Sequence, residues 1–188
     1  LMRALPNMKV YSPADALECR AVVDLLPTTP GPKYIRLGKN KEPRIHEVQP
    51  DLSTGAPVLV RDGSDVTLIV VGPIVTQAIE AADALAKQGV SVRLLTCPVI
   101  KPLNITAIRE AAAGTVGIVT LEEHTLMGGF GSAVLEALAV NGWRIPVLPL
   151  ALNDAAAATV GSQEYLREHN GLSTESVIAR IADFTASV

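Results

Sequence analysis

One short segment of the chain combines side chains that can move protons with glycines that can bring a backbone close to a ligand. Its acid and base side chains are Glu122, Glu123 and His124, and its glycines are Gly128, Gly129 and Gly131. Glutamate and histidine act as general acids and bases. Glycines before a helix let backbone N–H groups approach an anion at the helix N-terminus. The segment could therefore hold an acid–base cluster, an anion-binding loop or an interface with a neighbouring chain.

Structural explanations compete with each of these functions. The glycine spacing is not that of the dinucleotide fingerprint, because residues 150–152 are apolar where that fingerprint needs an acidic residue. Glycines that permit a tight turn and close helix packing are the favoured interpretation. The three polar side chains can equally hydrogen-bond the loop itself. We therefore predict no catalytic residue in this chain, and we retain Glu123, His124 and the glycines as candidates for an interface or an anion loop.

Arg36 is the second candidate for contact with a ligand, because it is a single guanidinium between apolar neighbours on a short predicted strand. Such an arginine can bind a phosphate or carboxylate through two hydrogen bonds, or can pair with a carboxylate of the protein. Asp62-Gly63 does not begin a magnesium loop, because the next asparagine is Asn104. Histidines 46 and 169 lie in polar stretches where exposure is expected. The sequence therefore predicts no metal site.

Composition and charge exclude several classes of protein. Hydrophobic residues make up 48% of the chain and charged residues 19%, which is typical of a folded domain. A net charge of −3, without basic stretches interleaved with aromatic residues, argues against nucleic-acid binding. The longest apolar stretch, residues 66–75, is too short to span a bilayer, and no signal peptide is recognised. We therefore expect a cytoplasmic protein that does not bind membranes.

Hydrophobic periodicity predicts the elements that position these residues. Strands are predicted at 58–60, 66–71, 90–95, 116–121 and 145–150. Helices are predicted at 74–86, 105–112, 132–140 and 174–184. The first two strands flank a turn-prone sequence, residues 62–64, and are expected to form a hairpin. The alternation of strands and helices predicts an α/β fold, with a mostly parallel sheet and helices on both faces.

The first 50 residues predict a smaller unit. Strands are expected at 8–11 and 33–37, with a helix between them. Ser12 is the expected N-cap of that helix, followed by Pro13 in its first turn and Asp15 near its positive end. Residues 38–56 read as a linker. Because one helix between two strands is too little for an independent domain, we divide the chain into residues 1–50, a remnant with a linker, and residues 51–188, a compact domain.

Six segments, in order, resemble the C-terminal half of the transketolase family. They are MRALPNM at 2–8, SPADALE at 12–18, GPKYIRL at 31–37, DGSDVTLIVVG at 62–72, KPL at 101–103 and EEHTLMGGFGS at 122–132. The first three resemble the end of the family's pyrimidine-binding domain, and the others resemble its C-terminal domain. The resemblance implies that residues 1–50 are a remnant of the pyrimidine-binding domain, and that residues 51–188 form the C-terminal domain.

The resemblance also implies a chemistry, which belongs to an intact enzyme. That enzyme uses thiamine diphosphate and magnesium to transfer a ketol unit between sugar phosphates. Arg36 matches the family arginine that binds the sugar phosphate, and His124 is expected near the domain interface. The diphosphate-binding domain, and the glutamate that activates the cofactor, match no part of this chain. We therefore expect the chain alone to bind no cofactor and to be inactive, and to act as a homodimer or with an N-terminal catalytic subunit.

Three alternatives stay open at this point. The chain could be part of a deoxyxylulose-phosphate synthase or of a 2-oxoacid dehydrogenase β subunit. Transketolase is preferred to the synthase because residues 34–38, YIRLG, lack the Tyr-Pro-Arg-Gly sequence of the latter. The chain could also be a dimerisation or regulatory module without chemistry of its own. Finally, it could be a domain that binds small anions through the loop at residues 128–132.

Overall fold

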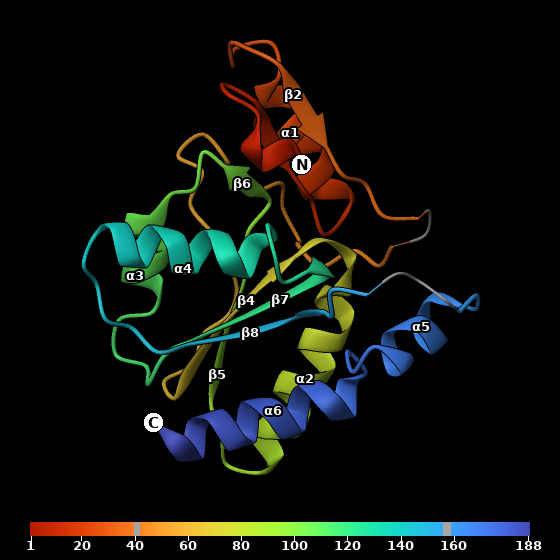
Figure 1. Ribbon diagram of the computed structural model, residues 1–188, viewed down its shortest axis with the longest axis vertical. Coiled ribbons are helices and arrows are strands. Elements are labelled where there is room, and N and C mark those ends of the chain that lie inside the picture. The colour runs from red at the N-terminus through yellow and green to blue at the C-terminus, as the bar shows by residue number, and fades with distance from the viewer. Residues whose placement is uncertain (40–41, 156–158) are drawn as a thin grey trace.

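The structure, a computed structural model, describes residues 1–39, 42–155 and 159–188 and contains a large sheet of five strands (Figure 1). The order of its strands is β3-β5-β4-β7-β8. Strand β4 pairs in parallel with β5 and β7, and β7 pairs in parallel with β8. The predicted α/β fold with a mostly parallel sheet is therefore confirmed. The strands are β3 (Val58–Arg61), β4 (Val66–Val71), β5 (Val92–Thr96), β7 (Ile118–Thr125) and β8 (Val147–Leu152).

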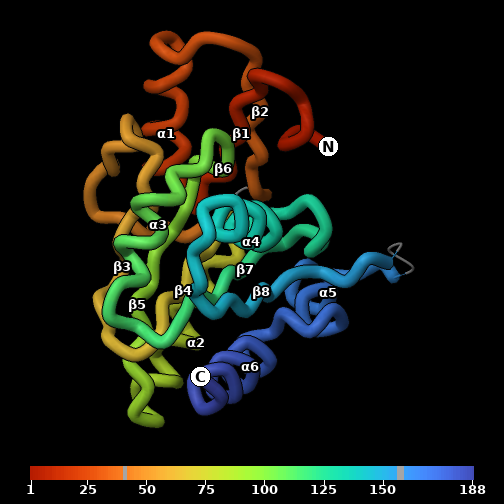
Figure 2. Tube along the Cα trace, turned by 60° about the vertical axis from the view of Figure 1, so that its left-hand side comes forward, coloured from red at the N-terminus to blue at the C-terminus, as the bar shows by residue number. Residues whose placement is uncertain are grey.

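Helices cover both faces of this sheet (Figure 2). One face packs against α2 and α6 through a cluster that includes Leu68 and Val70 of β4, and the other packs against α3 and α4 through a cluster that includes Ile69. Successive side chains of a strand point to opposite faces, so burial on both faces requires the continuous apolar run of β4. The helices are α2 (Val75–Lys87), α3 (Ile105–Ala111), α4 (Phe130–Val140) and α6 (Thr174–Ser187), with a short 3-10 turn, η2 (Gly72–Ile74), before α2.

The predicted hairpin between residues 58–60 and 66–71 is wrong. Strand β3 pairs antiparallel with β5, while β4 lies in the middle of the sheet between β5 and β7. The turn between β3 and β4 packs against the start of β5: a Cβ atom on Gly63 would collide with the backbone of Val92 and Arg93. In addition, Arg93 Nε donates a hydrogen bond to Asp62 Oδ1 at 3.1 Å. The turn is thus held against β5, which places β3 beside that strand.

The first segment, residues 1–39, builds a second sheet with the order β2-β1-β6. Strand β1 pairs in parallel with β2 and antiparallel with β6, which follows β5 in the chain. A strand from the second half of the chain therefore completes the sheet of the first segment, and the division at residue 50 stays a prediction. The elements are the 3-10 turn η1 (Met2–Ala4), β1 (Lys9–Tyr11), α1 (Ala16–Leu25), β2 (Lys33–Ile35) and β6 (Val99–Lys101).

Helix α1 begins later than the sequence suggests, because Asp15 and not Ser12 is its N-cap. Asp15 Oδ1 accepts a hydrogen bond from the N–H of Glu18 at 2.8 Å. The N–H of Ser12 instead donates to the carbonyl of Pro98 at 2.9 Å, so this residue still belongs to the pairing of β1 with the chain before β6. Cross-strand pairing thus keeps Ser12 extended and moves the cap to the next side chain that can accept the hydrogen bond.

A buried polar cluster joins α1 to the large sheet. Glu18 is fully buried and accepts hydrogen bonds from the N–H of Ala14 at 2.7 Å, from His46 Nε2 at 2.8 Å and from the hydroxyl of Thr96. Thr96 ends β5, whereas His46 comes from the stretch predicted as a linker. The expectation that His46 is exposed is wrong, because its side chain is only 9% exposed. Three segments distant in the sequence therefore meet at one carboxylate.

Stability is expected to fall as the pH rises from the unfolded-state pKa of His46 through its higher folded-state pKa. The hydrogen bond from His46 to Glu18, helped by the charges of Glu18 and Asp15 and opposed by burial, raises the pKa of His46 above 6.5. The protonated ring therefore stabilises the fold fully below the unfolded-state pKa, and this contribution is lost as the pH rises through the folded-state pKa. Urea unfolding at a series of pH values should show the decline. A His46→Gln variant should lose it, and an unchanged profile in that variant would contradict the assignment.

Candidate functional site

A cavity of about 530 Å³ lies at the carboxyl ends of β4 and β7. After β4 the chain passes through α2 to β5, which lies next to β4 in the sheet. It later returns to β7, which lies next to β4 on the opposite side. The strand order therefore reverses between β4 and β7, which is where ligands bind to open parallel sheets. Val71 and Pro73, at and after the end of β4, line one part of the cavity, and residues 122–124 of β7 line another.

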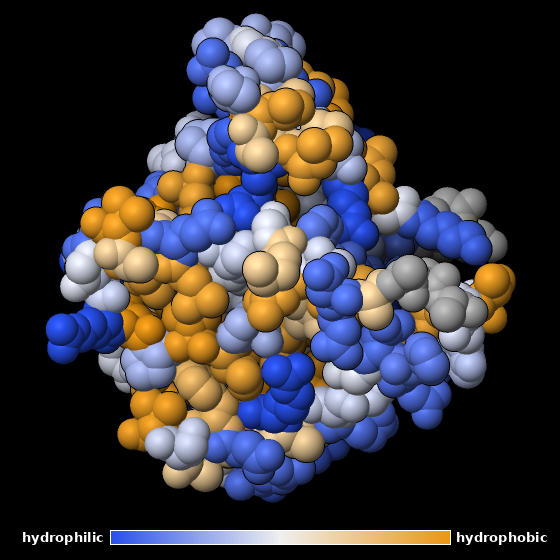
Figure 3. Space-filling model, in the orientation of Figure 1, coloured by the Kyte–Doolittle hydropathy of each residue, from blue (hydrophilic) through white to orange (hydrophobic). Residues whose placement is uncertain are grey.

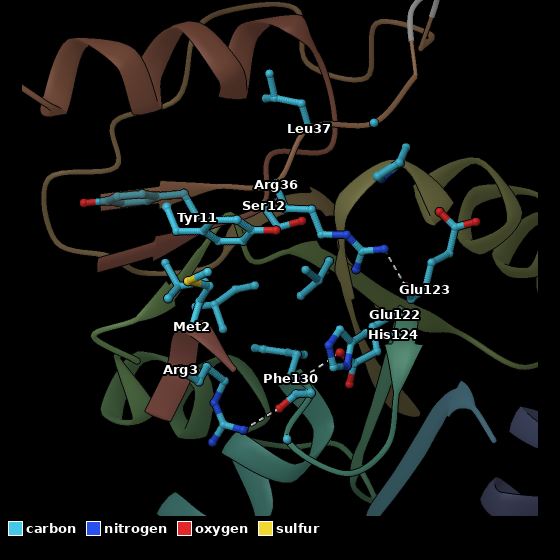
Figure 4. Close-up of a pocket in the computed structure, with 18 of the residues that line it drawn as sticks. Met2, Arg3, Tyr11, Ser12, Arg36, Leu37, Glu122, Glu123, His124 and Phe130 are labelled. Atoms are coloured by element: carbon cyan, nitrogen blue, oxygen red, sulfur yellow. Dashed lines mark hydrogen bonds between the residues drawn. The ribbon is translucent and has the colours of Figure 1, made fainter. Parts of the chain in front are cut away.

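The first segment forms the opposite wall of this cavity (Figure 4). The side chains of Met2, Arg3, Tyr11 and Arg36 reach it from η1, β1 and the residue after β2. Arg3 Nη1 donates to the carbonyl of Gly129 at 2.9 Å, and Arg3 Nη2 pairs with a glutamate of α4 at 2.6 Å. The cavity is thus built only when the first segment and the large sheet come together.

Arg36 lies at the exposed edge of the cavity. Its backbone N–H donates to the carbonyl of Tyr11 at 2.8 Å and so extends the pairing of β1 with β2. Its Nη2 donates to the carbonyl oxygen of Glu123 at 2.7 Å. A guanidinium has five N–H donors, and this is the single hydrogen bond that the Arg36 side chain makes within the described parts of the chain. The remaining donors could contact a phosphate or a carboxylate.

Glu122 occupies the anion position at the N-terminus of α4. Its Oε2 accepts a hydrogen bond from the N–H of Phe130 at 2.7 Å, and its Oε1 accepts one from the N–H of Gly131 at 2.8 Å. Burial raises the pKa of Glu122, although these two N–H donors and the charges of His124 and Arg3 oppose the increase. The positive end of the helix therefore already binds a carboxylate of the protein itself.

The glycines of the loop allow this carboxylate to approach the backbone. A Cβ atom on Gly129 would lie 2.5 Å from Glu122 Oε2, and one on Gly131 would lie 2.7 Å from Thr120 Oγ1. Gly128 has a φ of +78°, a backbone conformation that side chains disfavour. These contacts support the interpretation of a tight turn with close packing. The N–H groups of Phe130 and Gly131 already donate to Glu122, so they are not available to bind an external anion.

The neighbouring residues of β7 turn to different partners. Glu123 Oε1 accepts a hydrogen bond from Arg167 Nε at 2.7 Å, and both side chains are largely buried. His124 Nδ1 lies 2.9 Å from the carbonyl of Thr125, which assigns the proton to Nδ1. The His124 ring lies beside Glu122 in the cavity (Figure 4). The cavity is lined by five of the residues predicted from the sequence, Arg36, Glu123, His124, Gly128 and Gly129, whereas Gly131 is not part of its lining.

Sequence reasoning missed the helix that supports Glu123. Helix α5 (Gln163–His169) begins after Ser162, whose side chain accepts a hydrogen bond from the N–H of Tyr165. Its Arg167 and Gln163 side chains both bind Glu123. The signal was present, since a serine N-cap precedes an acidic first turn and a basic last turn. Hydrophobic periodicity does not predict this helix, because its sequence has no sustained apolar period.

Within residues 1–39, 42–155 and 159–188, no group of three or more His, Cys, Asp or Glu side chains could hold a metal ion. No helix in the part of the chain that the structure describes is long and apolar enough to cross a membrane.

Comparisons with known proteins agree on one family. The family model described as transketolase, C-terminal domain, matches residues 55–177. One subunit of the apulose-4-phosphate transketolase of Actinobacillus succinogenes is 30% identical over 95% of this chain and 57% of that subunit. The 1-deoxy-D-xylulose-5-phosphate synthase of Thermomicrobium roseum is 37% identical over 99% of this chain and 30% of that enzyme. A solved split-gene transketolase, an inactive β4 tetramer, matches with a TM-score of 0.87 and 35% identity over 97% of this chain and 58% of that chain. The chain therefore spans little more than half the length of the apulose-4-phosphate transketolase subunit and of the solved chain.

Proposed function

The chain belongs to the transketolase family as a C-terminal portion, and from this premise we propose that it is part of a thiamine-diphosphate-dependent enzyme. The proposed reaction is transfer of a two-carbon ketol unit between sugar phosphates. The observation that carries the proposal is the position of Arg36, at the edge of the cavity with one nitrogen 2.7 Å from the carbonyl of Glu123. An arginine anchored in this way can offer its other donors to a phosphate without losing its place.

The proposal places the thiamine diphosphate site outside this chain. Within residues 1–39, 42–155 and 159–188, no group of three or more His, Cys, Asp or Glu side chains could hold a metal ion. The two buried glutamates, Glu18 and Glu122, are each bound to donors of the protein. In the proposal, another subunit therefore supplies the cofactor site, and this chain alone binds no cofactor and catalyses nothing.

The proposed partner is an N-terminal catalytic subunit or a second copy of this chain. Two comparisons support this proposal, because the relative from Actinobacillus succinogenes is named as one subunit of its enzyme and the solved split-gene transketolase is a tetramer. Apolar side chains are visible on the first segment and near α3 and α4 on the face that Figure 3 shows. Exposed large apolar residues of the first segment and of α4 include Leu1, Leu5, Leu37, Leu135 and Val140. Such surfaces are suited to contact with another chain.

Two further parts of the proposal concern organisation and location. We assign residues 1–50 to a remnant of the pyrimidine-binding domain with its linker, residues 51–188 to the C-terminal domain, and the protein to the cytoplasm. A deoxyxylulose-phosphate synthase is the second candidate, because the relative from Thermomicrobium roseum is 37% identical. A product assay separates the two, since the synthase releases carbon dioxide from pyruvate and ketol transfer releases none.

Replacing Arg36 by alanine is expected to impair the use of phosphorylated substrates selectively. In the enzyme reconstituted with its catalytic subunit, the KM for a sugar phosphate acceptor should rise about 100-fold, equivalent to about 3 kcal/mol of lost charged hydrogen bonds. The KM for an unphosphorylated acceptor should change little. Arg20→Ala, which removes another exposed arginine, is the matched control. An equal loss for both acceptors would contradict the assignment of Arg36 to the phosphate.

Calorimetric titration with thiamine diphosphate and magnesium tests the proposed division of labour. The chain alone should give no heat of binding, and the chain with its catalytic subunit should bind the cofactor. Binding by the chain alone would show that the cofactor site is not shared, and the role of the glycine loop at residues 128–131 would have to be reconsidered.

A further inference from the structure

A line of four hydrogen-bonded residues connects helix α2 to Arg36. Gln77 of α2 accepts a hydrogen bond from Arg167 Nη1 at 2.8 Å, and Arg167 Nε donates to Glu123 Oε1 at 2.7 Å. The main-chain carbonyl of the same Glu123 accepts the hydrogen bond from Arg36 Nη2 at 2.7 Å. We call the set Gln77, Arg167, Glu123 and Arg36 the arginine relay. It links α2, α5, the end of β7 and the residue after β2.

The middle of the arginine relay is well suited to hold its end in place. The Arg167 side chain is 10% exposed and the Glu123 side chain 19%, so water competes little for their ion pair. Arg167 donates from two different nitrogens to two residues, which fixes the plane of its guanidinium. Gln163, one turn earlier on α5, adds a contact with Glu123 Oε1 at 3.2 Å. Glu123 is thus held from its side chain, and its carbonyl is held with it.

Within the described parts of the chain, the Arg36 side chain is held by one hydrogen bond alone. Its backbone N–H extends the pairing of β1 with β2, but its side chain is exposed. An exposed arginine side chain samples many rotamers, and ordering it on binding a ligand costs free energy. The hydrogen bond to the carbonyl of Glu123 removes much of that freedom before a ligand arrives. Whatever fixes Glu123 therefore influences how well Arg36 is placed for an anionic group.

We propose that Arg167 is a positioning residue that holds the Arg36 side chain in place through Glu123. Helix α5 would then control how tightly Arg36 binds a substrate phosphate. The proposal rests on the phosphate-binding role proposed above for Arg36. Arg167 does not touch the ligand in this account; it holds the carboxylate of Glu123, and the carbonyl of Glu123 holds the arginine that does. Glu42 lies near the same pair: burial raises the pKa of Glu42, and the charge of Arg167 opposes this.

The first test uses the chain alone and does not depend on its function. Nitrogen-15 NMR follows the Arg36 side chain, since a guanidinium held by a hydrogen bond rotates slowly and gives separate N–H signals. We expect these signals to merge or broaden in two variants, Arg167→Ala and Glu123→Gln. Glu123→Gln keeps the main-chain carbonyl that binds Arg36 but removes the ion pair with Arg167. Arg180→Ala, at an exposed site on α6, should leave them unchanged. Unaltered Arg36 signals in both folded variants would overturn the proposal.

The second test uses the enzyme reconstituted with its catalytic subunit. Arg167→Lys retains the charge but cannot donate to Gln77 and Glu123 from one rigid plane, so the KM for a sugar phosphate should rise about tenfold with kcat unchanged. The KM for an unphosphorylated acceptor should stay constant. If the Arg36 NMR signals change but the KM values for both acceptors rise equally, Arg167 does position Arg36, and the proposed binding of phosphate by Arg36 is refuted. If the signals do not respond, the positioning itself is refuted, whatever the kinetics.

Discussion

Glu18→Ala is expected to lower the free energy of unfolding by about 4 kcal/mol, because it removes one partner of a buried ion pair. The substitution would leave three donors without their acceptor: the N–H of Ala14, the hydroxyl of Thr96 and the ring of His46. Glu18 is fully buried, so water cannot replace the lost carboxylate without opening the structure. Urea unfolding followed by circular dichroism measures the loss directly.

The consequences of Glu18→Ala should be concentrated in the first segment. Because Glu18 joins α1 to the end of β5, amide hydrogen exchange should accelerate most in residues 9–35. Glu110→Ala, at an exposed site on α3, is the matched control and should change stability by less than about 0.5 kcal/mol. Glu18→Gln preserves the volume and should cost less than Glu18→Ala. A loss of under about 1 kcal/mol for Glu18→Ala would mean that the cluster contributes little.

Gly129→Ala and Gly128→Ala should differ strongly although the two residues are adjacent. A Cβ on Gly129 would lie 2.5 and 2.6 Å from the oxygens of Glu122 and 2.6 Å from the carbonyl of Thr125. Glu122 cannot withdraw easily, because two N–H groups hold it. We expect Gly129→Ala to destabilise the fold by about 3 kcal/mol, at the upper end of the cost of overpacking.

Gly128→Ala provides the matched control for this prediction. A Cβ there would meet nothing within 4 Å, so the cost is the strain of a φ of +78° alone. That strain is about 1 kcal/mol. Unfolding of both variants under the same conditions gives the comparison. Equal costs would indicate that the backbone conformation, and not the approach of the buried carboxylate, is what requires glycine in this loop.

Local patterns were sufficient for the fold class. The apolar run of β4 indicated a strand and the helical periods of α2, α4 and α6 indicated helices, and the alternation of these elements indicated a sheet covered on both faces. The same patterns placed the segment at residues 122–132 across a strand end and a helix start, where the cavity lies. They worked because the period of an amphipathic element depends on neighbouring residues only. Periodicity does not predict helix α5, because this helix has capping residues but no apolar period.

Pairing partners and side-chain partners required the tertiary structure. The hairpin prediction failed because the contact of Gly63 with the start of β5 is not local. Ser12 and Asp15 were both able to cap α1, and the pairing of Ser12 with the chain before β6 decided between them. Glu122 and Glu123 face opposite ways along β7, but the partners that they meet, the N-terminus of α4 and Arg167 of α5, depend on how those helices pack.

By itself, the sequence determined the alternation of elements, the two-sided burial of the sheet and the residue types available to a ligand. The tertiary structure decided which of those residues meet. Arg36 and Glu123 are 87 positions apart, yet one hydrogen bond joins them. Glu122 belonged to a possible acid–base cluster, and the structure shows that its carboxylate accepts hydrogen bonds from the helix that follows it. Such contacts depend on how segments that are distant in the sequence pack together, and the hydrophobic periodicity of the sequence does not predict that packing.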